Sequence, residues 1–214
     1  MNLLLRLMKI LLAARFRAPL SLFGVSRVRF RVWPNDLDLN RHMNNGRFLT
    51  VMDLGRIDLM ARMGVLGIFK KRKWMPVVAA ETISFKRPLN PFERYELTSR
   101  ILCWDERFLY LEQVFVKENG KVAARALVKA AIRAHARAVK TQEILEALAV
   151  PKRKSPPIPP GIKAWALAAE WMEEGGEPAN DPGSAAKPDT PATLKVQVRA
   201  EERERKKTAG KEGA

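Results

Sequence analysis

One stretch of helical periodicity does most to limit the folds open to this chain. Between Arg47 and Met63 the apolar residues recur at intervals of three and four, and together they cover most of the helix circumference. A helix that is apolar on nearly every side has to be enclosed by other elements. Gly55 lies in the middle of this stretch, where a glycine costs about 1 kcal/mol relative to alanine, and a close approach to a sheet would explain its presence. The sequence therefore predicts a long central helix packed tightly against a sheet.

Strand-like segments on both sides of this helix supply the sheet. Residues 26–33 alternate between apolar and basic side chains, which is typical of a strand with one face in solvent. Asn119-Gly120 predicts a type I′ hairpin, and a closing helix over residues 141–148 is expected to take Thr141 as its N-cap. An antiparallel sheet wrapped around one long helix is an α+β layout. The strand-like runs that follow the central helix are residues 77–86, 94–103, 108–117 and 121–137.

Composition divides the chain into three parts. Residues 1–24 open with a leucine-rich stretch, and residues 25–150 hold the central helix and the strands. Residues 151–214 begin with a proline-rich linker, which is expected to be stiff and extended, followed by a short helical patch over residues 162–172. Beyond that patch the sequence has too few apolar residues to form a core, so a disordered tail is expected.

The leucine-rich start predicts an amphipathic helix rather than a membrane span. Arg6 and Lys9 interrupt its apolar runs, which are shorter than the roughly 20 residues that a transmembrane helix needs and fit a secretory signal poorly. Two interpretations stay open. Either residues 1–18 lie on an anionic membrane surface, or this helix packs on its own domain or on a partner subunit. The apolar residues that share one helix face are Leu4, Leu5, Met8, Leu11 and Leu12.

A large basic surplus favours an anionic partner. The chain has 39 Lys and Arg against 23 Asp and Glu, a formal net charge of +16, which suits nucleic acid, acidic lipid or a phosphate-bearing small molecule. The cations are spread along the sequence and no recognised nucleic-acid motif is present, so nucleic acid is not an expected partner. With one cysteine and two histidines, neither an intramolecular disulfide nor a metal site is expected, and no cofactor is implied.

The polar segment between the first strand and the central helix concentrates the chemistry. Residues 35–46 hold two carboxylates, several amides and one imidazole, and they lead directly into the helix. Unpaired N–H groups at a helix N-terminus can polarise a carbonyl or hold an oxyanion, and a carboxylate beside them can attack the polarised carbon or orient a water. These are the groups that acyl transfer needs. The same composition also fits an ordinary helix cap preceded by a turn.

The segment from Trp33 to Leu49 resembles a known signature. Its pattern Asp-x-Asp-x-Asn-x-His-x-Asn-Asn, followed by the central helix, is similar to that of hot-dog-fold acyl thioesterases, which include the 4-hydroxybenzoyl-CoA thioesterase superfamily, plant acyl-carrier-protein thioesterases and bacterial thioesterase-like proteins. The order of elements between residues 28 and 137 fits the same fold. The resemblance implies a hot-dog sheet around one long helix, a homodimer or dimer of dimers whose sheets join edge to edge, and an active site at the subunit interface.

The resemblance also implies roles for individual residues. Asp38 matches the carboxylate that serves as nucleophile or general base. Asn40 would bind the thioester oxygen or position water, and His42 would orient water or assist proton transfer. The residues that lie where the helix N-terminus would polarise the carbonyl are Asn45, Gly46 and Arg47.

The implied reaction is hydrolysis of an acyl-CoA or an acyl-carrier-protein thioester to a free acid and a thiol. Lys86 and Arg87 are expected to contact the phosphates of such a substrate. The plant enzymes carry a further catalytic glutamate, whose position falls at or near Pro88, so Glu81 or Glu93 would have to replace it. We expect a cytoplasmic enzyme of fatty acid metabolism, with peripheral attachment to the inner face of the membrane as a further option. The alternative is a hot-dog protein that binds acyl chains or a membrane surface without hydrolysis.

Overall fold

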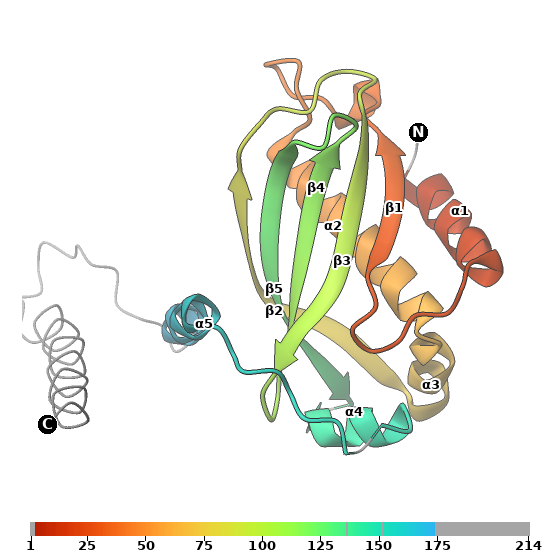
Figure 1. The fold of residues 1–214 in the computed structure, drawn as a ribbon, viewed down its shortest axis with the longest axis vertical. Helices are drawn as coiled ribbons and strands as arrows, with labels where there is room; N and C mark the ends of the chain where they lie inside the picture. The colour runs from red at the N-terminus through yellow and green to blue at the C-terminus, as the bar shows by residue number, and fades with distance from the viewer. Residues whose placement is uncertain (1–2, 136, 151, 174–214) are drawn as a thin grey trace, which may run out of the picture. The chain divides into compact units, whose positions relative to one another are not determined.

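The elements follow the predicted order along the chain. The computed structural model describes residues 3–135, 137–150 and 152–173 (Figure 1), so the expected tail beyond residue 173 lies outside the described residues. In chain order the elements are α1 (Leu3–Phe16), β1 (Ser26–Arg31), the 3₁₀ turn η1 (Pro34–Asp36), α2 (Asn45–Arg62), α3 (Val65–Arg72), β2 (Trp74–Phe85), β3 (Arg94–Trp104), β4 (Leu109–Lys117), β5 (Val122–Ala134), β6 (Arg137–Val139), α4 (Thr141–Ala147) and α5 (Pro160–Glu173).

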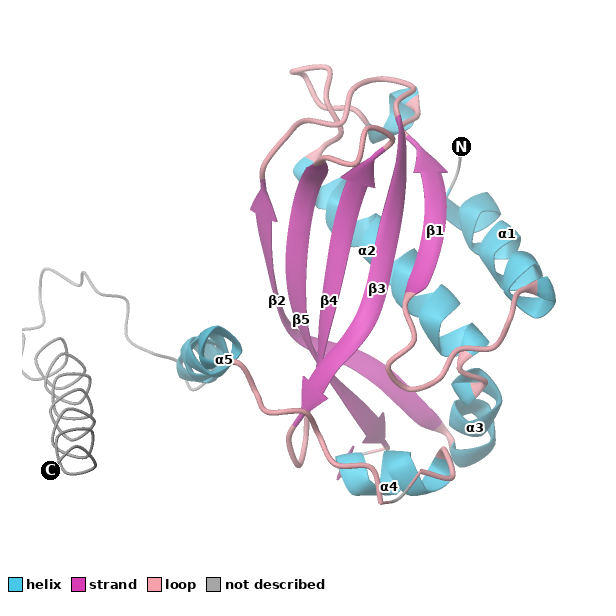
Figure 2. Cartoon of the chain, viewed as in Figure 1, coloured by secondary structure: helices cyan, strands magenta, loops and turns pink. Residues whose placement is uncertain are grey.

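The strands form one antiparallel sheet that curls around the central helix. Their order is β1-β3-β4-β5-β2, with the short β6 pairing the far end of β5. Figure 2 shows the strands side by side with α2 lying across one face of the sheet. This is the predicted α+β hot-dog fold, and within it β1 and β2 are the two edge strands.

The sheet approaches α2 most closely at Gly55. A Cβ added there would lie 2.6 Å from the Ser99 hydroxyl oxygen and 2.7 Å from Leu97 Cδ2, distances that ordinary side chains do not tolerate. The explanation given for this mid-helix glycine is therefore confirmed. The residues of α2 that are buried are Phe48, Val51, Met52, Leu54, Gly55, Arg56, Asp58 and Leu59.

A buried glutamine fixes the helix against the sheet at the same level. Gln113 of β4 is fully buried, and its amide nitrogen donates to the Ser99 hydroxyl at 2.7 Å and to the Met52 carbonyl at 2.9 Å. Its amide oxygen accepts from Arg56 of α2 at 2.9 Å. Because buried polar groups need partners, these bonds favour one position of α2 along the sheet over its neighbours.

Two flanking helices pack onto this core. On α1, Ile10 joins Val28 of β1 and Leu54 of α2 in a buried cluster. Apolar residues of α5 pack on a cluster contributed by β3, β4 and β5, and Lys129 donates to Glu170 of α5 at 3.1 Å. Among the residues that the structure describes, none of the helices is long and apolar enough to cross a bilayer.

The β4–β5 hairpin is not the predicted type I′ turn. A type I′ turn needs positive φ at both central residues, but here Gly120 has φ of 76° while Asn119 does not have a positive φ. The Gly120 N–H donates to the Lys117 carbonyl at 2.9 Å. The connection is therefore the longer hairpin, in which a glycine follows the turn and forms a bulge.

The start of α4 and the presence of α3 also differ from expectation. Thr141 is the first residue inside α4 rather than its N-cap, because the N-cap is Lys140, whose backbone N–H donates to the Glu143 carboxylate at 3.1 Å. An acid three residues on thus satisfies the helix start. Helix α3, which was not predicted from the sequence, follows Gly64, which has φ of 74°.

Candidate functional site

The polar segment before α2 folds into a closed turn. Leu37 and Met43 pair as an isolated antiparallel bridge at its base. Above them, the Asp38 N–H donates to the His42 carbonyl at 2.9 Å, and the Arg41 N–H donates to the Asp38 carbonyl at 3.1 Å. Arg41 adopts φ of 60°, the left-handed conformation that reverses the chain. We call residues 38–42 the Asp38 turn.

The Asp38 turn gathers the three residues predicted to be catalytic. Asp38 Oδ1 accepts from the backbone N–H groups of Asn40 at 2.9 Å and of His42 at 3.3 Å. These bonds fix one oxygen of the carboxylate, and Oδ2 has no partner among the described residues. Asp38 and His42 are half-buried, whereas Asn40 is exposed and Leu39 at the tip is fully exposed. The turn therefore holds the Asp38 carboxylate in one orientation and carries the His42 side chain in the same short segment.

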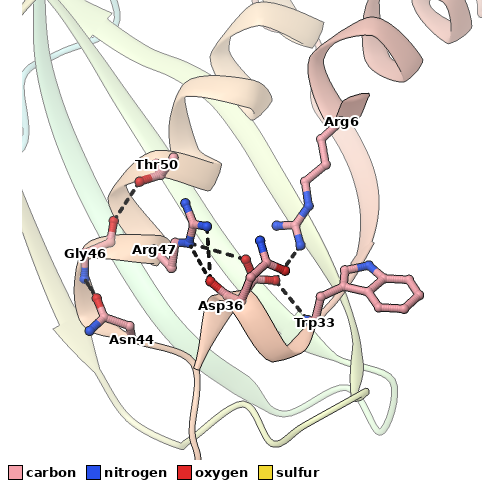
Figure 3. Close-up of polar contacts among 8 residues, drawn as sticks. Arg6, Trp33, Asp36, Asn44, Gly46, Arg47 and Thr50 are labelled. Carbon is pink, nitrogen blue, oxygen red and sulfur yellow. Dashed lines mark hydrogen bonds and ion pairs between the residues drawn. The ribbon is translucent and has the colours of Figure 1, made fainter. Parts of the chain in front are cut away.

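A second carboxylate, that of Asp36, links the segment before the Asp38 turn to neighbouring elements. Asp36 is fully buried, accepts from the Trp33 N–H at 2.9 Å and forms an ion pair with the buried Arg6 of α1 (Figure 3). Its backbone carbonyl accepts from the Asn44 N–H at 2.8 Å, and Arg47 Nε lies 3.4 Å from its Oδ1. Asp36 thus ties together the end of β1, the N-terminal helix and the start of α2.

This link was not predicted from the sequence. There Asp36 is only one of two carboxylates in the loop, and Arg6 is one of the cations that interrupt a leucine-rich helix. The signal was a single arginine inside an otherwise apolar turn of helix, which is typical of a paired, buried cation. No local pattern indicates which carboxylate it meets, because 30 residues separate Arg6 from Asp36.

The N-terminus of α2 begins directly after this turn. Asn44 is its N-cap: the side-chain oxygen accepts from the Gly46 N–H at 2.8 Å, and its backbone carbonyl accepts from the Arg47 N–H at 2.9 Å (Figure 3). The Asn45 N–H has no hydrogen-bond partner among the described residues. Asn44 therefore occupies the N–H groups of Gly46 and Arg47. The Asn45 N–H remains for a substrate oxygen. The Arg47 guanidinium folds back onto the loop.

The predicted phosphate contacts lie in a segment that borders the site. Directly after β2, the backbone N–H groups of Lys86 and Arg87 donate to the Ala123 carbonyl at 2.7 and 3.0 Å. Farther along, the Leu89 carbonyl accepts from the Met43 N–H at 2.9 Å, which joins this segment to the base of the Asp38 turn. The Lys86 side chain is exposed. Arg87 donates its guanidinium to the Val122 carbonyl at 2.9 Å.

The two suggested replacements for the downstream glutamate are both engaged elsewhere. Glu81 of β2 accepts from Arg56 of α2 at 3.3 Å, and Glu93 lies 3.0 Å from the ammonium group of Lys117. Among the described residues, no hydrogen bond or ion pair joins either carboxylate to the Asp38 turn.

The start of α2 also lies next to the open edge of the sheet. The rings of Phe48 in the first turn of α2 and Phe85 at the end of β2 are 5.1 Å apart, and Phe85 remains 43% exposed. Because β2 is an edge strand, a strand from another chain that paired with β2 would lie beside Phe85 and the start of α2.

Known proteins resemble this chain over the region that holds the site. The family described as "Thioesterase-like superfamily" matches residues 32–166. A Danio rerio relative named Protein THEM6 is 34% identical over 152 residues, which are 70% of this chain and 73% of the relative. The Xenopus laevis protein of the same name is 31% identical over 134 residues, which are 63% of each chain. The match thus spans just under two thirds of that relative's length.

A solved structure shares the fold. The probable thioesterase YbaW from Escherichia coli superposes with a TM-score of 0.55 at 23% identity, covering 60% of this chain and 99% of that protein. The part that superposes is thus almost the whole of YbaW, while the remaining residues of this chain lie outside it.

Proposed function

We propose that this chain, which belongs to the thioesterase-like superfamily, hydrolyses an acyl thioester to a free acid and a thiol at the Asp38 turn. One observation carries the proposal. Backbone N–H groups of Asn40 and His42 hold the Oδ1 of Asp38, in a turn whose base, the Leu37–Met43 pair, leads directly into the N-cap of a buried helix. This combination supplies a base or nucleophile together with a group that stabilises negative charge.

In the proposed reaction the thioester oxygen approaches the Asn45 N–H, where the partial positive charge of the α2 N-terminus polarises the carbonyl. Asp38 Oδ2 takes a proton from a water that adds to the carbonyl carbon, and His42 and Asn40 orient that water. The tetrahedral intermediate then breaks its C–S bond and expels the thiolate, which takes the proton back from Asp38, and the acid and the thiol are released. Direct attack by Asp38 through an acyl-enzyme anhydride is the other course open to the same carboxylate.

The proposed substrates are acyl-CoA and acyl carrier protein thioesters. Both donors are anionic, and the net charge of +16 favours their approach. Lys86 is the better placed of the two predicted phosphate contacts, since its side chain is exposed, whereas the guanidinium of Arg87 is bonded to a backbone carbonyl. We assign the enzyme to fatty acid metabolism in the cytoplasm, with peripheral attachment to the membrane through residues 1–18.

A homodimer would complete the site. The free edge of β2 is 12 residues long and exposes Met75, Val78 and Phe85, and an open apolar edge of this kind invites pairing with another strand. Pairing between two copies of β2 would bring the partner chain beside Phe85 and hence beside the start of α2. Light scattering on the chain and on Thr82→Pro, which removes a backbone donor in mid-strand, tests this: a wild-type monomer would rule the dimer out.

The decisive experiment for the activity is thiol release from a panel of acyl-CoA substrates of different chain length. Asp38→Asn keeps the oxygen that holds the turn but removes the charge, so it should lower kcat by about 100-fold or more, and His42→Ala should lower kcat less. Asp105→Asn is the matched control, because Asp105 Oδ1 also accepts from two backbone N–H groups, those of Arg107 and Phe108, in a turn at another place.

Each outcome discriminates between the candidate functions. Full activity in Asp38→Asn would contradict the proposed site, and equal losses in Asp38→Asn and Asp105→Asn would point to damage of the fold. A wild-type chain that binds acyl-CoA but releases no thiol from any substrate would support the alternative function, a hot-dog protein that binds acyl chains without cleaving them.

A further inference from the structure

Helix α1 turns its apolar face outward. Its buried residues are Arg6, Ile10 and Ala14, which face α2 and β1. The opposite face carries large apolar side chains that are between 42% and 80% exposed. A contiguous apolar surface of this kind is uncommon on monomeric proteins and marks a contact with lipid or protein. The exposed residues of this face are Leu4, Leu5, Met8, Leu11, Leu12 and Phe16.

A trough runs beside this face, between α1 and residues of β1, β3 and β4. It consists of two adjoining hollows of about 870 and 580 Å³, which share Lys9, Ile10, Val28, Arg29 and Glu96. Figure 1 shows α1 lying alongside β1 at the end of the sheet that is remote from β2. The trough is therefore distinct from the Asp38 turn, which contributes no residue to its lining.

The walls of the trough carry a surplus of positive charge. Three acids line it, and each has a cationic partner: Asp58 pairs with Arg17 at 2.9 Å, Glu96 with Arg27 at 2.9 Å and Glu118 with Arg94 at 3.9 Å. Lys9 and Arg31 form no ion pair among the described residues. The cations that line the two hollows are Arg6, Lys9, Arg17, Arg27, Arg29, Arg31, Arg94 and Lys117.

Two residues that line the larger hollow also carry buried polar atoms. Tyr95 is only 2% exposed, and its hydroxyl makes no hydrogen bond to any described residue. Arg6 Nε, in the guanidinium that pairs with Asp36, is likewise buried and unbonded, as is Asp36 Oδ1. These atoms are closed off from solvent, so the cations on the walls, and not the buried atoms, would contact an anion in the trough.

The trough and the apolar face open side by side. Leu5, Lys9 and Ala13 succeed one another at four-residue intervals, so they form one row along α1, and Lys9 and Ala13 line the trough. Leu12 and Phe16 form the next row on the exposed face. A single occupant can therefore meet cations with one part and leucines with another.

We propose that the trough holds the phosphate headgroup of an anionic phospholipid while the leucine face of α1 enters the acyl region of the same leaflet. An acidic protein would satisfy the cations but would leave the leucines in water, and a second copy of this basic chain would bring like charges together. A lipid leaflet satisfies both features. This inference goes beyond hydrolysis and does not depend on it.

The test uses the full chain and sedimentation with vesicles of phosphatidylcholine alone or of phosphatidylcholine and phosphatidylglycerol in equal parts. Binding is expected only with phosphatidylglycerol, and it should weaken steeply as salt rises. Arg29→Gln/Arg31→Gln should weaken it roughly 30-fold, since each cation near an acidic surface contributes about fivefold. Lys70→Gln/Lys71→Gln is the matched control, because these exposed cations of α3 lie outside the trough.

Further variants separate the two parts of the contact. Leu4→Ser/Leu12→Ser should abolish sedimentation, whereas Leu167→Ser, on the exposed part of α5, should not.

Several results would overturn the proposal. Equal binding to both vesicles would exclude headgroup recognition, and self-association that Leu4→Ser/Leu12→Ser removes, without vesicle binding, would assign the face to a second copy. Binding of acyl carrier protein in place of vesicles would assign the trough to an acidic protein. Acyl-CoA hydrolysis without vesicle binding would refute this inference alone, while vesicle binding without hydrolysis would support it and count against the proposed function.

Discussion

Replacing Arg6 with methionine is expected to lower the free energy of unfolding by about 3 kcal/mol. The Arg6 and Asp36 side chains are 3% and 0% exposed, and removing one partner of a buried ion pair usually costs about 3–5 kcal/mol, because the other charge is left uncompensated. We take the lower end of this range since Asp36 keeps the Trp33 N–H and lies near Arg47 Nε. For a chain of this size the midpoint of thermal unfolding should fall by roughly 6–12 °C.

Urea denaturation followed by tryptophan fluorescence measures this change, and a double-mutant cycle identifies its cause. Asp36→Asn should destabilise by a similar amount, whereas Arg6→Met/Asp36→Asn should cost less than the sum of the single changes, since the double variant leaves no isolated charge. Lys9→Met, on the same helix, is the control and should stay within about 0.5 kcal/mol of the wild type. A loss below about 1 kcal/mol in Arg6→Met, or strict additivity in the cycle, would refute the reasoning.

Two further outcomes follow from other contacts. Gly55→Ala should destabilise by about 1–3 kcal/mol in urea, because the new methyl would lie 2.6 Å from the Ser99 hydroxyl; a stabilised variant would mean that α2 can move off the sheet. The Arg137 guanidinium and the Lys140 N–H lower the pKa of Glu143 from 4.5 to about 2, so this carboxylate stabilises the fold above pH 4.5 and loses that effect as the pH falls towards 2. Glu143→Gln should therefore shift the urea midpoint slightly at pH 7 and not at pH 2, and a shift of equal size at both pH values would contradict this; the effect is small because the pair is exposed.

The sequence predicted the central helix and the sheet because their signals are local. The apolar spacing between residues 47 and 63 and the alternation over residues 26–33 each reflect the faces that α2 and β1 bury. Even Gly55 could be explained, since a costly residue in mid-helix indicates a close approach. The hairpin type and the cap of α4 were missed because the sign of φ at Asn119, and one acid three residues after Lys140, decide between alternatives of similar energy.

In the candidate site, too, local sequence signals predicted some features and missed others. Asp38, Asn40 and His42 are close in sequence, and the structure places them in one turn, while their catalytic roles stay predictions. The occupation of the Gly46 N–H by Asn44 could not be read from composition, because Asn44 and Asn45 are chemically equivalent until the backbone selects one of them as the cap. The pairing of Arg6 with Asp36 depends on how α1 docks, which no local pattern encodes.

The Arg6–Asp36 contact has a practical consequence for anyone who shortens this protein. Deletion of α1 would leave the buried Asp36 carboxylate without its ion-pair partner. It would also loosen the loop that carries Asp38, the proposed catalytic carboxylate. A truncated chain that neither floats with liposomes nor turns over substrate would thus say nothing about lipid attachment. Single replacements on the outward side of that helix are the cleaner tool.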